Sequence, residues 1–181
     1  MTTIKIENIV AYAKISELLD IELIAEKIPN SSYNPDEYNG VSIKFDDLKI
    51  AVIVLSNGKV VCTGAKKLQD AESTLKKVIK QIKDIGFELQ KGYKIEIENV
   101  IASTDLKKEL HLASIANALV LQNVKYEPEE FPGLIYKMEE LCTMVLLFSS
   151  GKIVCTGAKS IDDAKKSMKT MNEKLASIGV L

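Results

Sequence analysis

The sequence predicts an α+β fold built from two copies of one repeat, each with several strands and two helices. Three observations lead to this prediction. Residues 56–66 recur as residues 149–159 with nine of eleven positions identical. Alternating apolar residues and hairpin signals surround both copies, which indicates antiparallel strands. The last apolar stretch of each half has helical spacing and ends at a glycine. Such internal similarity predicts one continuous architecture with two-fold pseudosymmetry.

The first half begins with a predicted strand and a short helix. Residues 4–13 alternate between apolar and polar side chains, as a half-buried strand does. Residues 17–28 have the pattern of a helix, which Pro29 ends because proline cannot continue it. Residues 41–46 alternate again and predict a second half-buried strand.

A hairpin and a long helix complete this half. Two apolar runs, residues 50–55 and 59–63, flank Asn57-Gly58, and Asn-Gly between apolar runs is a strong hairpin signal. The long helix follows and ends at Gly86, and the same pattern recurs 93 residues later. The core-facing residues of the two long helices are expected to be Ala71, Leu75, Val78, Ile82 and Ile85, and Ala164, Met168, Met171, Leu175 and Ile178.

The repeat boundaries are predicted at residues 1–91 and 92–181. No linker rich in Pro, Gly or Ser separates the halves, and the join near Lys91-Gly92 is expected to be a short turn. The longest apolar runs have strand length, far short of the ~20 residues that a membrane helix needs. The N-terminus has no apolar signal-peptide region, so an intracellular protein is expected.

Composition argues against several classes of protein. A net charge of −1 and a pI near 6.0 are unlike those of a globally basic nucleic-acid binder. The three cysteines form no CxxC pair and there is one histidine, so structural zinc is not expected. No other metal and no cofactor is expected either. Cys62 and Cys155 occupy matching repeat positions and are interpreted as small buried residues. His111 is interpreted as an ordinary surface or boundary residue at a helix start. Because no catalytic arrangement of side chains stands out, the chain is not expected to be an enzyme.

One face of the predicted sheet should stay uncovered, because two helices per half can cover only the other face. A solvated face is normally polar. In these strands, however, the side chains on both faces of the sheet are largely apolar. The uncovered parity carries the aliphatic and aromatic residues Val10, Ile53, Leu55, Val61, Ile101, Leu146, Phe148 and Val154. Asn8, Asn99, Thr63 and Thr156 share this parity, and repeat-matched lysines surround it: Lys44, Lys59, Lys66, Lys137, Lys152 and Lys159.

An uncovered apolar face is an interaction surface. A widened DNA minor groove fits it, because sugars and base edges lie there between two rows of phosphates. A dimerisation sheet or a face for a lipid-like ligand remains an alternative from the pattern alone.

Four groups of residues resemble one known family over essentially the whole chain. They are the doubled Gly-Lys-(Val/Ile)-Val-Cys-Thr-Gly-Ala-Lys, the strand Ile6–Ala11 with its copy Ile97–Ala102, Tyr33-Asn-Pro35, and the segment Tyr126–Tyr136. Together they resemble the TATA-box-binding protein family in its archaeal form. The resemblance implies a single curved antiparallel sheet, a saddle, with the helices on its convex face.

The resemblance also implies a function. Members are general transcription initiation factors, not enzymes, that bind the minor groove of TATA-box promoter DNA and bend it with apolar wedges. The implied partners are double-stranded promoter DNA, a B-type initiation factor and, indirectly, RNA polymerase, with no membrane and no cofactor. Whether the free protein also forms a weak homodimer through the apolar face is left open by the sequence. The expected location is the cytoplasm, at the nucleoid, for an archaeal protein and the nucleus for a eukaryotic one.

The family's functional positions carry over onto four sets of residues. The DNA-intercalating set is Phe131, Phe148, Tyr38 and Leu55, where the first-half positions depart from the family's usual phenylalanine. The minor-groove set is Asn8, Asn99, Thr63, Thr156, Val10, Ile101, Ile53, Leu146, Val61 and Val154. The phosphate set is Lys44, Lys59, Lys66, Lys137, Lys152, Lys159, Asn57 and Ser150. The partner-binding set is the acidic Glu127, Glu129 and Glu130.

Two other classes of function are alternatives. A duplicated scaffold could use the apolar face to bind a protein or a ligand. A nucleic-acid enzyme on a related sheet, such as a base-excision domain, would need a catalytic carboxylate or lysine in a pocket, and the sequence indicates none.

Overall fold

The computed structural model describes residues 3–119 and 123–181. In these residues ten strands form one antiparallel sheet, accompanied by four α-helices, and the strand order is β2-β3-β4-β5-β1-β6-β10-β9-β8-β7. The chain divides into two compact units. The first unit is Asn8–Glu98, and the second unit joins the residues up to Glu7 with Asn99–Leu181. The predicted α+β fold of two repeats in one antiparallel sheet is confirmed.

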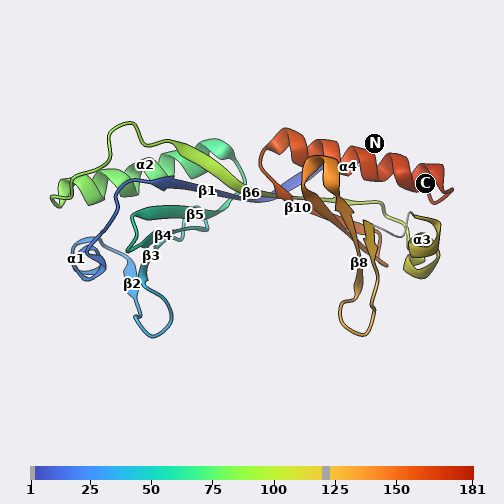
Figure 1. Ribbon diagram of the computed structural model, residues 1–181, viewed down its shortest axis with the longest axis horizontal. Coiled ribbons are helices and arrows are strands. Elements are labelled where there is room, and N and C mark those ends of the chain that lie inside the picture. The colour runs from blue at the N-terminus through green and yellow to red at the C-terminus, as the bar shows by residue number, and fades with distance from the viewer. Residues whose placement is uncertain (1–2, 120–122) are drawn as a thin grey trace. The chain divides into compact units, whose positions relative to one another are not determined.

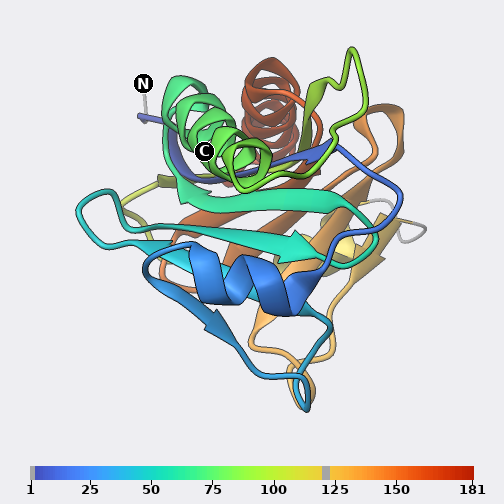
Figure 2. The same cartoon turned by 90° about the vertical axis from the view of Figure 1, so that its left-hand side faces the viewer.

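The first half contains the predicted elements and one strand that was not predicted. In chain order they are β1 (Lys5–Lys14), α1 (Ile21–Lys27), β2 (Ser31–Tyr33), β3 (Gly40–Phe45), β4 (Ile50–Leu55), β5 (Lys59–Ala65) and α2 (Leu68–Asp84). The short edge strand β2 was missed. Helix α1 begins later than predicted because the Asp20 carboxylate caps it, accepting a hydrogen bond from the Leu23 amide at 3.0 Å. Figure 2 shows α1 beside β2 and β3, which it contacts.

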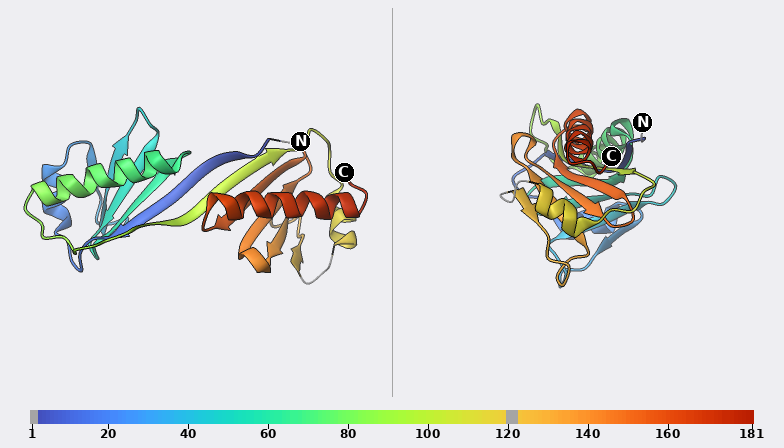
Figure 3. Two further views of the ribbon diagram at one scale, coloured as in Figure 1. Left: turned by 90° about the horizontal axis from the view of Figure 1, so that it is seen from above. Right: turned by 90° about the vertical axis from the view of Figure 1, so that its right-hand side faces the viewer.

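The second half repeats this order. Its elements are β6 (Ile95–Asp105), α3 (Leu112–Ala118), β7 (Val124–Lys125), β8 (Gly133–Met138), the 3₁₀ helix η2 (Glu139–Leu141), β9 (Thr143–Phe148), β10 (Lys152–Ala158) and α4 (Ile161–Ser177). Each long helix packs on the hairpin of its own unit, α2 on β4 and β5 and α4 on β9 and β10, as the ribbon views show (Figure 1, Figure 3).

The long helices bury the apolar stripe that their spacing predicts. In α2, Leu75, Val78 and Ile82 are fully buried, and in α4 Met168 and Met171 are 1% and 0% exposed. The methionines are therefore core residues, as predicted. Gly86 follows α2 with a φ of 106°, a left-handed conformation that glycine adopts without steric cost. Its amide donates to the Lys83 carbonyl oxygen at 3.0 Å, which closes the end of the helix.

The ends of β1 and β6 are exchanged between the compact units. In the first unit, the Tyr12 hydroxyl of β1 donates a hydrogen bond to Glu96 of β6 at 2.6 Å. In the second unit, the Ser103 hydroxyl of β6 donates to Glu7 of β1 at 2.5 Å. Each unit therefore contains part of both strands. For this reason the ends of the compact units differ from the ends of the two predicted sequence repeats. The repeat boundary at residues 91 and 92 stays a prediction.

Candidate nucleic-acid interface

The sheet of each unit has one buried face and one partly exposed face. On β9 and β10, Val145, Ile153 and Cys155 are fully buried, whereas their neighbours Leu146 and Val154 are half-buried. The same alternation occurs on β4 and β5. The buried rows face α2 or α4. We call the partly exposed rows the open face, and its sequence-predicted members are Asn8, Val10, Ile53, Leu55, Val61 and Thr63 in the first unit and Asn99, Ile101, Leu146, Phe148, Val154 and Thr156 in the second.

Sequence reasoning missed two members of the open face in the second unit. Met144 lies opposite Thr156 in the β9–β10 pairing and is 47% exposed. Ile135 of β8 lies opposite Leu146 and is half-buried. Both follow the alternation of their strands, and this signal could have found them. They were overlooked because their repeat counterparts, Ser42 and Ala51, are not apolar residues of comparable size.

A hydrogen-bonded pair of polar side chains lies on the open face of the first unit. The Asn8 side-chain Nδ2 donates to Thr63 Oγ1 at 3.1 Å, and the Gly64 amide donates to Asn8 Oδ1 at 2.7 Å. Because a backbone N–H can only donate, this second bond identifies the amide oxygen of Asn8. Gly64 has a φ of 97°, and a Cβ there would lie 2.3 Å from the Lys49 carbonyl oxygen, so only glycine fits.

The second unit repeats this pair with nearly identical geometry. The Asn99 Nδ2 donates to Thr156 Oγ1 at 3.2 Å, and the Gly157 amide donates to Asn99 Oδ1 at 2.7 Å. In each pair the asparagine oxygen is occupied, while one amide hydrogen and the threonine hydroxyl hydrogen are left to donate. The two pairs therefore present hydrogen-bond donors, which suit a partner surface of acceptors.

The structure brings the predicted wedge residues of the second unit together. Phe131, in the β7–β8 loop, and Phe148, at the end of β9, have ring centroids 5.9 Å apart at an interplanar angle of 64°. This edge-to-face arrangement is a favoured one for aromatic pairs. Gly133 makes room for it, because a Cβ there would lie 2.7 Å from Phe131 Cε1 and 3.2 Å from Phe148 Cε1.

The first unit has the equivalent pair, Tyr38 and Leu55, around Gly40. A Cβ on Gly40 would lie 2.9 Å from Leu55 Cδ2 and 3.1 Å from Tyr38 Cδ2. Tyr38 is 37% exposed. The four predicted wedge residues therefore form two pairs at matching positions of the two repeats, and each pair packs around a glycine.

Five of the six predicted rim lysines are exposed, and Lys59 is half-buried. The exposed ones are Lys44, Lys66, Lys137, Lys152 and Lys159. The Lys59 Nζ forms an ion pair with Glu98 at 2.8 Å and lies 4.4 Å from the ring centroid of Tyr12. The hydrogen bond from Tyr12 to Glu96 raises the pKa of Tyr12. Lys59 therefore already has an anionic partner.

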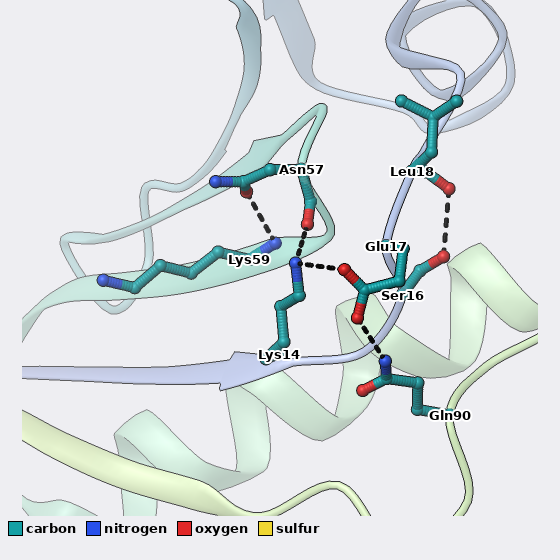
Figure 4. A network of polar contacts seen from close by, with 7 residues as sticks. All are labelled: Lys14, Ser16, Glu17, Leu18, Asn57, Lys59 and Gln90. Carbon is teal, nitrogen blue, oxygen red and sulfur yellow. Dashed lines mark hydrogen bonds and ion pairs between the residues drawn. The ribbon is translucent and has the colours of Figure 1, made fainter.

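The tip of the β4–β5 hairpin is anchored by a polar network (Figure 4). The Lys14 Nζ donates to the Asn57 carbonyl oxygen and forms an ion pair with Glu17 at 3.4 Å. Glu17 in turn accepts a hydrogen bond from Gln90 Nε2 at 2.8 Å. The Asn57 Oδ1 accepts from the Lys59 amide at 3.0 Å, so the part of the Asn57 side chain left for a partner is the donating Nδ2.

Lys14 is a rim cation that sequence reasoning missed. It lies opposite Lys59 in the β1–β5 pairing. In the second unit, Asp105 lies opposite Lys152 in the β10–β6 pairing. Comparison of the repeats selects only lysines that are present in both halves. Lys14 was missed because the matching residue of the second half is Asp105.

The tip of the second hairpin, which carries Ser150, is held by backbone contacts. The Leu110 amide donates to the Ser149 carbonyl oxygen at 2.8 Å. Gly151 has a φ of 88°, and a Cβ there would lie 2.2 Å from the Lys108 carbonyl oxygen. Ser150 is exposed beside this close approach.

Comparison with known proteins identifies the family. The model of the family described as transcription factor TFIID (or TATA-binding protein, TBP) matches twice, at residues 3–85 and 94–178. The chain belongs to the TATA-binding protein family. This family consists of transcription factors and not of enzymes, and its two matches agree with the two repeats of the sequence.

Archaeal relatives align over nearly the whole chain. The TATA-box-binding protein of Archaeoglobus fulgidus is 40% identical over 178 residues, covering 98% of this chain and 97% of its own. That of Pyrococcus horikoshii is 43% identical over 178 residues, with coverages of 98% and 92%. Among solved structures, Methanococcus jannaschii TBP is similar with a TM-score of 0.82 and 39% identity, covering 96% of this chain and 98% of that one.

The acidic residues of the β7–β8 loop are all exposed, but two of them share a cation. Lys125, which sequence reasoning missed, forms ion pairs with Glu127 at 2.8 Å and with Glu130 at 3.3 Å. These contacts raise the pKa of Lys125, and the hydrogen bond from Lys125 lowers the pKa of Glu127. Glu129 lies beside them, exposed. The acidic loop of this family member therefore carries less net charge than its three glutamates suggest.

Neither a metal site nor a membrane-spanning helix is found in the part of the chain that the structure describes. No three His, Cys, Asp or Glu side chains there converge to hold a metal ion. Across residues 3–119 and 123–181, no helix has the length and apolar character that a bilayer crossing requires. His111 is exposed at the start of α3, as predicted.

The cysteines are predicted to differ strongly in reactivity. Cys62 and Cys155 are buried and Cys142 is exposed. Burial raises the pKa of Cys62 to about 11 and also raises that of Cys155. Because the thiolate is the reactive form, only Cys142 should react rapidly with a disulfide reagent at pH 8.

A thiol titration measures this difference. The expected result is one fast equivalent in the native protein and three in denaturant. A Cys142→Ser variant should lose the fast equivalent, and more than one fast equivalent in the native protein would contradict the burial of the other two thiols.

Proposed function

We propose that this chain is a general transcription initiation factor that binds the minor groove of TATA-box promoter DNA, bends it and recruits a B-type initiation factor. RNA polymerase would join through that factor. The chain would act as two repeats, residues 1–91 and 92–181. The observation that carries the proposal is the open face: a partly exposed apolar surface with two matched donor pairs and lysines at its rim. The TATA-binding family of the chain supports the same function.

The donor pairs suit the minor groove. That groove presents acceptors at every base pair, adenine N3 and thymine O2 among them, and its code distinguishes mainly A·T from G·C. Asn8 with Thr63 and Asn99 with Thr156 would donate to these atoms. The aliphatic members would press on sugars and base edges and exclude the guanine amino group; they are Val10, Ile53, Val61, Ile101, Leu146 and Val154.

The wedge pairs would bend the DNA. Phe131 with Phe148, and Tyr38 with Leu55, would insert between base pairs at the two ends of the site, unstacking them and opening the groove. Such bending costs several kcal/mol and is least costly at pyrimidine–purine steps such as TA. Specificity for a TATA sequence would therefore come largely from the ease of deforming it.

The rim would contact phosphates and compensate for the unremarkable net charge. The six lysines, with Asn57 and Ser150 at the hairpin tips, would lie along the two phosphate rows. Six such contacts give a slope of log affinity against log salt near −5, at roughly −0.9 per contact. The slope should be somewhat shallower here, because Lys59 exchanges its ion pair with Glu98 for a phosphate.

The acidic β7–β8 loop, with Glu127, Glu129 and Glu130, would bind the B-type factor. Because Lys125 pairs with two of these carboxylates, a basic partner would compete with it for them. The archaeal relatives support a place at the nucleoid in the cytoplasm, and the open face would let the free protein pair weakly with a second copy.

A gel-shift comparison tests the proposed function. A TATA-containing duplex and a G/C-rich duplex of equal length are titrated at the same moderate salt. The expected preference for the TATA duplex is at least about 1,000-fold, the lower end for specific DNA binding. Equal affinity for the two duplexes would refute the proposal.

Replacing Lys152 by alanine should weaken binding to every duplex in the same proportion. Lys152 is exposed at the rim, and loss of one phosphate contact should reduce the magnitude of the salt slope by about 1. Binding isotherms at several salt concentrations measure this slope. The control is Lys165→Ala, which removes an exposed lysine from the outer helix α4. An equal effect of both variants would indicate a general charge effect and contradict a specific contact at Lys152.

A further inference from the structure

The wedge pairs of the two repeats differ in chemistry. In the second unit, two aromatic rings support each other edge to face at 5.9 Å. In the first, Leu55 is aliphatic and Tyr38 carries a hydroxyl group. An aromatic face stacks on any base, whereas leucine has no such face. A hydroxyl group that enters a base step loses its water and needs a new partner. The first pair should therefore unstack DNA less than the second.

The apolar surface next to each wedge pair differs in the same direction. Ile135 lies two residues along β8 from Gly133, over which the phenylalanines pack, and Met144 follows on β9. The counterparts in the first unit are Ser42 and Ala51. The second unit therefore offers more apolar surface beside its wedge, to hold a groove that has been opened.

The rim differs as well. To contact a phosphate, Lys59 must leave Glu98 and the ring of Tyr12. In the second unit the residue at the place of Tyr12 is Ser103, which with Lys152 lines an open hollow. The carboxylates of Glu7 and Asp105 line the same hollow. Glu7 accepts a hydrogen bond from the Ser103 hydroxyl at 2.5 Å, and Asp105, which lies opposite Lys152, is bound at 2.8 Å by the Lys107 ammonium, which lowers the pKa of Asp105.

We propose that the two repeats deform DNA unequally, the second making a sharp kink and the first a shallow one, so that the chain has a preferred direction on DNA. This inference rests on the proposed function. A duplex whose single TA step lies at one end of the site is then bound with the second repeat, and with it Phe131 and Phe148, on that end. Tyr38 and Leu55 set the direction because they unstack DNA less than Phe131 and Phe148 do.

Energy transfer to Cys142 reports the direction. This thiol is exposed, the other two cysteines are buried, and the position that matches it in the first repeat is Lys49. An acceptor dye on Cys142 therefore marks one repeat. Donor dyes are placed on either end of a TATA duplex with one TA step, and the two transfer efficiencies give the ratio of orientations. We expect about tenfold preference for one direction, because a TA step unstacks much more easily than the steps around it.

Exchanging the wedge pairs is the decisive variant. The substitutions Tyr38→Phe, Leu55→Phe, Phe131→Tyr and Phe148→Leu keep the composition of the open face and should reverse the direction. The double variant Tyr38→Phe with Leu55→Phe should bring the ratio toward one. Thermal unfolding of both variants establishes that they fold.

The possible results separate this inference from the proposed function. Tight TATA binding by the wild type with a ratio near one overturns the inference and leaves the proposed function intact. A directional wild type whose direction survives the exchange also overturns it, because the wedges then do not set direction. Loss of TATA preference in the wild type instead refutes the proposed function itself. A base analogue that fluoresces when unstacked, placed at each wedge step, should be brighter beside Phe131 and Phe148 than beside Tyr38 and Leu55.

Discussion

Alanine at both Phe131 and Phe148 should abolish most of the DNA bending and lower affinity for a TATA duplex by roughly 100-fold. Stacking of an aromatic side chain on a base contributes about 1–3 kcal/mol, and 100-fold corresponds to about 2.7 kcal/mol. Part of the loss is offset because the variant no longer unstacks the bases. Energy transfer between dyes at the two ends of the duplex measures the bend.

The fold should tolerate this double substitution. Both rings are half-buried on the open face, outside the cores beneath the long helices. A matched control is Leu48→Ala, which removes a side chain that is 52% exposed in the β3–β4 turn. The control should bend DNA as the wild type does. Normal bending by the double-alanine protein would show that these rings are not the wedges.

Glutamate at two neighbouring positions of β10 should have opposite consequences. At Val154, on the open face, it should leave the fold intact and lower DNA affinity by more than about 100-fold, because a negative charge placed against DNA costs several kcal/mol. At Ile153, which is fully buried, it should destabilise the protein by about 3–5 kcal/mol, the cost of an unpaired buried charge.

Denaturant unfolding and gel shifts on both proteins check this pair. A conservative Ile153→Val change should cost only about 1 kcal/mol and bind DNA normally. Unfolding of the Val154→Glu protein, or its normal DNA binding, would contradict the two-faced sheet on which the proposed function rests.

Several features of the candidate site were predictable because the two repeats of the chain can be compared with each other, position by position. Tyr38 and Leu55 do not look like wedge residues by themselves, but their matches are Phe131 and Phe148, and the structure packs both pairs over a glycine. The alternation of side chains along the strand assigns Val61 and its neighbours to the open face from the sequence alone.

The same comparison concealed what the repeats do not share. Lys14 and Lys125 have no lysine at the matching positions, and Met144 and Ile135 match small residues. The edge strands β2 and β7 have three and two residues, too few for an alternation to be visible. The partners of a side chain are equally invisible, so the ion pair of Lys59 with Glu98 could not be foreseen.

The sequence by itself determined the two-fold repeat, the order of the helices and the longer strands, and the alternation that leaves one apolar face uncovered, because these follow from local spacing and from duplication. Only the tertiary structure decided which polar groups meet. The Asn8–Thr63 and Asn99–Thr156 bonds join residues 55 and 57 positions apart, and they form because a glycine in each hairpin can adopt a positive φ and bring its amide to the asparagine oxygen. Distance along the chain carries no information about such contacts, since they depend on the register of paired strands.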